Sequence, residues 1–127
     1  MADYTLQTCR KSIHIVIFTG GKSPSPASVS SYFSRSPAAD FVIAADSGLE
    51  TCRKFQAYFK TSYNFTPQCI LGDFDSISDK RVLAEYASEI VQKFSCDKDW
   101  TDTEIAIENA YKKAAHENSV PYITLIG

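Results

Sequence analysis

Two acidic residues, Asp73 and Asp75, directly follow an apolar stretch and a glycine. The apolar stretch is residues 69–71 (CIL), and the glycine is Gly72. Residues i and i+2 of an extended chain point to the same side, so the two carboxylates would lie close together. Two ionised carboxylates repel each other unless a cation lies between them or one takes up a proton. The pattern therefore predicts a site for a hard divalent cation, Mg²⁺ above all, which often binds together with a nucleotide phosphate.

Three further acidic residues follow other segments that are typical of strands. Asp46 comes directly after residues 41–45 (FVIAA), and Asp99 and Asp102 lie in the polar turn after residues 90–94 (IVQKF). Ligands bind beyond the carboxyl ends of the strands in open parallel sheets. We therefore expect the acidic residues to gather at one edge of a sheet, as a site for a hard cation and a polyphosphate.

The elements that would position these residues follow an alternating pattern along the chain. Apolar segments typical of strands alternate with helical patterns, and no hairpin turn chemistry joins the strands. This rhythm predicts an α/β fold: a mostly parallel sheet with helices on both faces, a Rossmann-like three-layer sandwich. The expected strands are 13–18, 41–45, 69–72, 90–94 and 121–126.

Helix signals separate the expected strands. Ser25 and Pro26 resemble the N-cap and the first residue of a helix, and residues 78–88 are also expected to be helical. The clearest helix follows residue 100, with a helical spacing of apolar positions that predicts its buried side. Those positions are Ile107, Ala110, Tyr111, Ala114 and Ala115.

The pattern [ST]-x-x-[DE] occurs at residues 47–50, 76–79 and 101–104, and it is typical of helix capping boxes. Its acidic residues favour the positive end of the helix dipole by ~0.3–1 kcal/mol each. We therefore interpret them as caps rather than as metal ligands. They are Glu50, Asp79 and Glu104.

Composition limits the possible partners. A chain of 127 residues with 44% hydrophobic and 22% charged residues is expected to fold as one domain. A net charge of −2 and dispersed basic residues give no indication of nucleic-acid or membrane binding. Four cysteines without a C-x-x-C pair, and an N-terminus without an apolar signal segment, favour a cytoplasmic protein with reduced thiols. His14 is expected in the core or on a sheet face.

A glycine pair, Gly20 and Gly21, follows the first expected strand. Its exposed amides could face phosphate, or it could form a plain tight turn, and the sequence leaves the two interpretations even. The sequence contains no P-loop, no G-x-G-x-x-G motif and no G-x-S-x-G motif.

Three motifs together resemble the thiamine pyrophosphokinase family. Residues 45–48 (ADSG), 71–77 (LGDFDSI) and 98–104 (KDWTDTE) are similar to its A-D-x-G, G-D-x-D-S and K-D-x-T-D-x-E motifs, in the same order. The resemblance implies transfer of a pyrophosphoryl group from ATP to thiamine, giving thiamine diphosphate and AMP, by a homodimer. Carried over by position, it implies that Mg²⁺ is bound by Asp46, Asp73, Asp75, Asp99 and Asp102.

The resemblance also implies roles in nucleotide binding and catalysis. Asp73 or Asp102 could accept the proton of the attacking hydroxyl. The expected contacts to ATP are Gly20, Gly21, Asp46, Gly48, Gly72, Ser76 and Thr101.

The family pattern continues, after a strand like residues 122–127, with a G-G-R-x-D-H segment and a C-terminal β-domain that are not in this sequence. Residues 1–127 are thus expected to be the catalytic α/β domain without that β-domain, as a fragment or a naturally short protein. Alternative functions are pyrophosphoryl transfer to a pterin alcohol, and a truncated nucleotide-binding or dimerisation module without activity. A DxD-type glycosyltransferase would leave Asp46 and Asp102 unused. A phosphatase with Asp73 as nucleophile would usually carry its acidic pair after the first strand, whereas here the pair follows the third expected strand.

Overall fold

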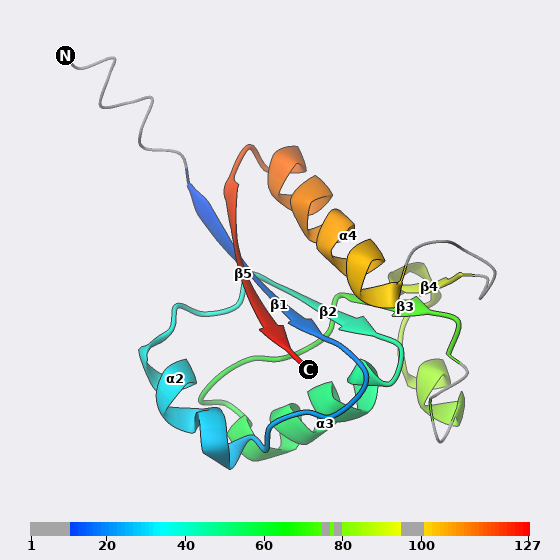
Figure 1. Ribbon diagram of the computed structural model, residues 1–127, viewed down its shortest axis with the longest axis horizontal. Coiled ribbons are helices and arrows are strands. Elements are labelled where there is room, and N and C mark those ends of the chain that lie inside the picture. The colour runs from blue at the N-terminus through cyan, green and yellow to red at the C-terminus, as the bar shows by residue number, and fades with distance from the viewer. Residues whose placement is uncertain (1–10, 75–76, 78–79, 95–100) are drawn as a thin grey trace.

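A single parallel sheet forms the centre of the molecule (Figure 1). The computed structural model describes residues 11–74, 77, 80–94 and 101–127. Within these residues five strands lie in the order β4-β3-β2-β1-β5, and every neighbouring pair is parallel, as the alternating pattern predicted. The strands are β1 (Ser12–Phe18), β2 (Phe41–Ala45), β3 (Cys69–Gly72), β4 (Val91–Lys93) and β5 (Val120–Ile126).

Helices cover both faces of this sheet, which confirms the three-layer prediction. α2 (Ser30–Arg35) and α3 (Gly48–Phe59) lie on one face, and α4 (Asp102–His116) lies on the other (Figure 1). The chain steps from β1 outward to β4 on one side of β1 and then returns to add β5 on the other side. Because the crossover connections are right-handed in both directions, α4 lies on the opposite face of the sheet from α3. In the described residues, no helix has both the length and the apolar character that crossing a membrane requires.

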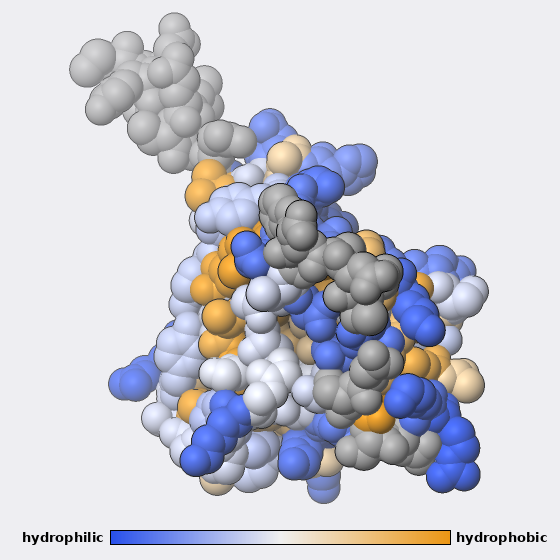
Figure 2. Space-filling view, turned by 45° about the vertical axis from the view of Figure 1, so that its right-hand side comes forward, coloured by the Kyte–Doolittle hydropathy of each residue, from blue (hydrophilic) through white to orange (hydrophobic). Residues whose placement is uncertain are grey.

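Two hydrophobic clusters, one on each face, form the core. The cluster under α2 and α3 is rich in aromatic residues, whereas the cluster under α4 is built from aliphatic strand residues and small helix residues. On the face of the molecule drawn in Figure 2, hydrophobic and hydrophilic residues are interspersed. The aromatic members of the first cluster are Phe18, Phe33, Phe55, Phe59, Tyr63, Phe65 and Phe74.

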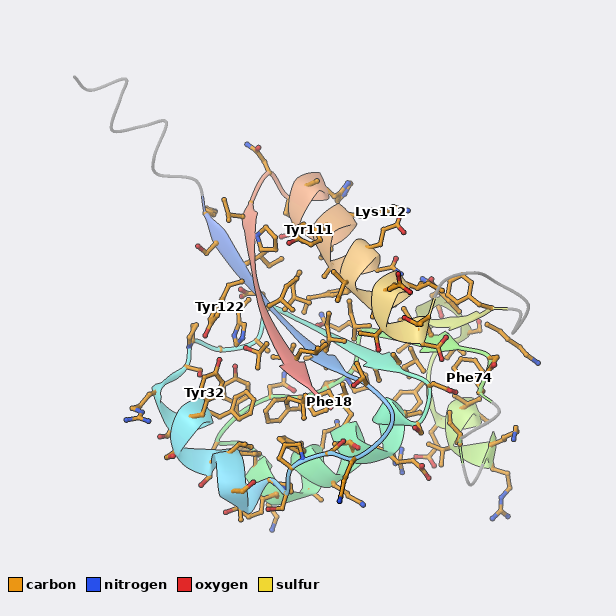
Figure 3. All side chains as sticks on the ribbon, viewed as in Figure 1. Phe18, Tyr32, Phe74, Tyr111, Lys112 and Tyr122 are labelled. Atoms are coloured by element: carbon orange, nitrogen blue, oxygen red, sulfur yellow. The ribbon has the colours of Figure 1, made fainter. Side chains whose placement is uncertain are left out.

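The buried side of α4 differs from the predicted one. Ala106, Ala110 and Ala114 are buried against the sheet, whereas Tyr111 is 56% exposed and Ala115 is exposed. A stripe of alanines lets the helix lie close to the sheet, and the large Tyr111 side chain stays at the surface beside it (Figure 3). The predicted stripe was therefore right for Ala110 and Ala114 and wrong for Tyr111 and Ala115.

Two other helix predictions need correction, because the chain there forms 3-10 turns. Residues 78–88 do not contain the expected α-helix: the described part forms the 3-10 segments η2 (Lys80–Glu85) and η3 (Ser88–Ile90). The segment after Ser25 also begins with a 3-10 turn, η1 (Ala27–Val29), before α2. Pro26 is its N-cap, and the Ser25 hydroxyl accepts a hydrogen bond from the Ser28 N–H at 3.3 Å.

Candidate metal and active site

Asp46 is the first residue after β2, and its backbone is anchored on both sides. Its φ of 54° lies in the left-handed region, which aspartate tolerates better than most residues. Its N–H donates to the Leu71 carbonyl of β3 at 2.7 Å, and its own carbonyl accepts from the Leu49 N–H of α3 at 3.1 Å. The two bonds hold Asp46 at the carboxyl end of the sheet, between the neighbouring strand and the following helix.

Asp73 occupies the same edge, one strand further along. It follows Gly72, whose φ is 133° and where an added Cβ would lie 3.1 Å from the Asp46 Cβ. The Gly72 carbonyl accepts from the Phe94 N–H at 2.8 Å, which extends the pairing of β3 with β4. Phe74, with a φ of 67°, is buried and lies at the end of β3 (Figure 3). The loop that carries Asp73 is thus tied to the core by its neighbours.

Asp102 begins α4, and a complete capping box fixes that helix start. The Thr101 hydroxyl accepts from the Glu104 N–H at 3.1 Å, and the Thr101 N–H donates to the Glu104 carboxylate at 2.9 Å. The hydrogen bond from the Thr101 backbone, followed by that from its side chain, lowers the pKa of Glu104. The capping prediction at residues 101–104 is confirmed.

The three aspartates come together although they are far apart in the sequence. Asp46, Asp73 and Asp102 each offer a carboxylate oxygen, and these oxygens lie within 4.8 Å of one another. All three residues are half-buried. Three ionised carboxylates this close repel one another, and the positive end of α4 offsets only part of that repulsion. A donor set made only of carboxylate oxygens suits a hard cation such as Mg²⁺.

Two of the glycines expected at the site, Gly20 and Gly48, allow close packing, whereas Gly21 provides a backbone conformation with positive φ. Gly21 has a φ of 96°, and a side chain on Gly20 would collide with the Ser47 hydroxyl. A side chain on Gly48 would collide with the Phe18 carbonyl oxygen, so this glycine lets α3 begin directly against the end of β1. Their expected contacts to ATP stay predictions. Asp75, Ser76 and Asp99 lie outside the described residues, as does Asp79, so the capping box expected at 76–79 stays a prediction.

The capping box expected at residues 47–50 does not form. Ser47 is the N-cap of α3, but its side chain makes no cap hydrogen bond. Its backbone has helical angles, φ −65° and ψ −9°, whereas a capping side chain needs extended backbone at that position. The interpretation of Glu50 as a capping-box residue was therefore wrong. The contact between Ser47 and the Gly20 turn was not predicted; the only available signal was the place of Ser47 directly after Asp46.

The family comparison agrees with this geometry. The family model for "Thiamin pyrophosphokinase, catalytic domain" matches residues 34–127, which include Asp46, Asp73 and Asp102. The chain belongs to this family. No curated protein matches the sequence.

A solved structure supports the fold. The chain is similar to thiamin pyrophosphokinase from Candida albicans, with a TM-score of 0.54 and 17% sequence identity. The match covers 85% of this chain and 38% of that one, so the chain spans well under half the length of this structural relative.

Proposed function

We propose that the protein transfers a pyrophosphoryl group from ATP to the hydroxyethyl oxygen of thiamine, giving thiamine diphosphate and AMP, with Mg²⁺ as cofactor. The observation that carries this proposal is the convergence of Asp46, Asp73 and Asp102 in a chain of the thiamin pyrophosphokinase catalytic-domain family. Acidic residues that lie apart in the sequence and meet at the carboxyl edge of a parallel sheet suit a metal and polyphosphate site.

The three aspartates would hold Mg²⁺, and Asp75 and Asp99 are proposed as further ligands. An ion held there would supply neutralisation of charge on the phosphate oxygens, which would favour displacement at the β-phosphorus. Asp73 or Asp102 would accept the proton of the thiamine hydroxyl. The backbone hydrogen bonds at Asp46 and Gly72 limit the motion of the carboxylates that would bind the metal. Such positioning is the main contribution that a protein makes to the transfer of phosphoryl and pyrophosphoryl groups.

Two other phosphate chemistries are less consistent with the arrangement. A DxD-type glycosyltransferase would rely on the segment after β3, and the close approach of Asp46 and Asp102 would then have no use. A phosphatase with Asp73 as nucleophile would usually carry its acidic pair after the first strand rather than the third.

The direct test is incubation of the protein with Mg²⁺, ATP and thiamine, followed by chromatography of the products. We expect AMP and thiamine diphosphate in equal amounts, and loss of both in Asp73→Asn. Glu108→Gln removes one carboxylate from the exposed side of α4 and is the matched control, which should retain the activity. Release of ADP or inorganic phosphate instead of AMP would contradict pyrophosphoryl transfer.

The same assay separates the remaining alternatives. AMP formation with a pterin alcohol, but not with thiamine, would assign a different acceptor. Mg²⁺-dependent binding of ATP that Asp73→Asn abolishes, without turnover of any acceptor, would indicate a nucleotide-binding module. We also propose that the protein is a cytoplasmic homodimer, and light scattering of the purified protein tests the dimer.

A further inference from the structure

Ser-Pro and Thr-Pro dipeptides are unusually frequent in this chain, and the proposed transfer of pyrophosphate does not use them. Four of the five prolines follow Ser or Thr, at residues 23–24, 25–26, 36–37 and 66–67. Proline-directed protein kinases modify the hydroxyl residue of such a dipeptide. The residue before proline is biased toward extended backbone, the conformation in which a kinase cleft binds its substrate. The structure distinguishes sharply among the four hydroxyls.

Ser36 is held at the end of α2, where a phosphate would be unfavourable. Its hydroxyl donates to the Tyr32 carbonyl at 2.8 Å, and phosphorylation would remove that donor. A phosphate there would also face the negative end of the helix. The Pro37 carbonyl accepts from the His14 ring at 2.9 Å and from the Tyr63 hydroxyl at 2.6 Å, which locks the segment in place.

Thr66 and Ser23 are also restrained. The Thr66 hydroxyl donates to the Asn64 side-chain oxygen at 2.7 Å, and its neighbours Phe65 and Pro67 are buried. Ser23 is half-buried, and its hydroxyl lies 3.3 Å from that of Thr51 in α3. Thr66 itself is exposed, but a kinase could bind the residues on both sides of it only after local opening of the chain, and Ser23 needs the same opening.

Ser25 differs from the other three. It is exposed together with the neighbouring Lys22 and Pro24, whereas the exposed Thr66 lies between two buried neighbours, and residues 23–25 form neither helix nor strand. Its hydroxyl oxygen accepts the Ser28 N–H at 3.3 Å, and a phosphate, with three acceptor oxygens, can keep that role.

We propose that Ser25 is a phosphorylation site for a proline-directed serine/threonine kinase acting on the folded protein. The Ser25 oxygen attacks the γ-phosphorus of the kinase's ATP, the bond to the departing ADP breaks, and the hydroxyl proton passes to a base of the kinase. The modification adds a charge of about −1.5 to −2 beside Lys22. This proposal does not depend on the proposed pyrophosphokinase function.

The test treats the folded chain with a purified proline-directed kinase and ATP, and locates the phosphate by mass spectrometry. A synthetic peptide of residues 19–40 serves as the unfolded reference. We expect a single phosphate on the folded chain, at Ser25, and labelling of the peptide at Ser23, Ser25 and Ser36. Ser25→Ala should lower incorporation by about tenfold or more, because the other sites need local opening. The matched control Ser36→Ala should leave it unchanged.

Each remaining outcome would overturn the proposal. A folded chain labelled chiefly at Ser23, Ser36 or Thr66 would show that accessibility does not select Ser25. A labelled peptide beside an unlabelled folded chain would show that the fold shields Ser25. A peptide without label would show that the sequence is no kinase substrate.

Discussion

At the scale of single residues, the candidate site depends on backbone conformations that most side chains avoid. Asp46, Gly72 and Phe74 all have positive φ, at 54°, 133° and 67°. For residues other than glycine such conformations cost on the order of 1–3 kcal/mol, and they concentrate at functional sites. The hydrogen bonds of Asp46 to β3 and α3 and the burial of Phe74 compensate for this strain.

Gly72→Ala is expected to weaken both folding and metal binding. Alanine disfavours the φ of 133°, and its Cβ would lie 3.1–3.2 Å from three Asp46 atoms, so Asp46 must shift. We expect a loss of about 1–3 kcal/mol in the free energy of unfolding. Mn²⁺ affinity should also fall. Gly21→Ala is the matched control, because Gly21 also has positive φ but faces open space. Equal Mn²⁺ affinities in the two variants would contradict the role given to Gly72.

The two described cysteines should resist thiol reagents in the folded protein. Burial raises the pKa of the Cys52 thiol to about 12 and that of Cys69 to about 11, from 9.0. With Cys9 and Cys96 replaced by serine, alkylation at pH 8 should require unfolding. Alkylation as fast as in the denatured chain would contradict this burial.

The same thiols give the protein a stability limit at alkaline pH. Above about pH 9 the unfolded chain loses thiol protons that the folded chain keeps up to about pH 11 for Cys69 and about pH 12 for Cys52. The free energy of unfolding should therefore fall as pH rises through this window. Urea denaturation at several pH values measures the slope. Replacing both cysteines by alanine should remove part of that slope, and an unchanged slope would contradict the assignment.

At the scale of elements, the starts of α3 and α4 show what a local pattern can predict. Both fit [ST]-x-x-[DE], yet only Thr101 and Glu104 form the box. Thr101 has extended backbone, with φ −74° and ψ 160°, whereas Ser47 directly follows the left-handed turn at Asp46 and is already helical. A four-residue pattern does not encode that difference in backbone conformation, because the pairing of β2 with β3 imposes it.

Thr101→Ala should destabilise the protein by about 1 kcal/mol, since α4 loses its side-chain N-cap. Ser47→Ala is the comparison at α3, where no side-chain cap bond exists, and we expect a smaller loss. The capping bonds lower the pKa of Glu104. The contribution of this carboxylate to the free energy of unfolding is therefore present above pH 4.5 and is lost as pH falls through the lowered pKa. Thermal unfolding of both variants measures the difference. Equal losses at Thr101 and Ser47 would contradict the capping assignment.

At the scale of the whole molecule, the sequence predicted the five strands, the parallel sheet and the layers, because β-branched runs and helical spacing are local signals. It did not predict the strand order, which depends on non-local pairing. The sequence also predicted which edge of the sheet carries the site, since the carboxyl ends of parallel strands must meet at one edge. The close approach of Asp46, Asp73 and Asp102 required the crossing of α4 over the sheet.

The aromatic cluster under α3 should account for a large share of the stability. Phe55 is fully buried, with ring centroids 5.1 Å from Phe18 and 5.5 Å from Phe65. We expect Phe55→Ala to cost about 3–5 kcal/mol in urea denaturation. Tyr58→Ala, on the same helix and 50% exposed, should cost about 1 kcal/mol or less. Similar losses in both variants would contradict this placement of the core.

The convergence of Asp46, Asp73 and Asp102 on one cation is tested most directly by Mn²⁺ binding, measured by electron paramagnetic resonance without any substrate. We expect a saturable site in the unmodified protein and an affinity lower by about tenfold or more in each single Asp→Asn variant, because each loses a charged ligand. Glu108→Gln should bind Mn²⁺ normally. Normal binding in any one of the three aspartate variants would contradict a shared site.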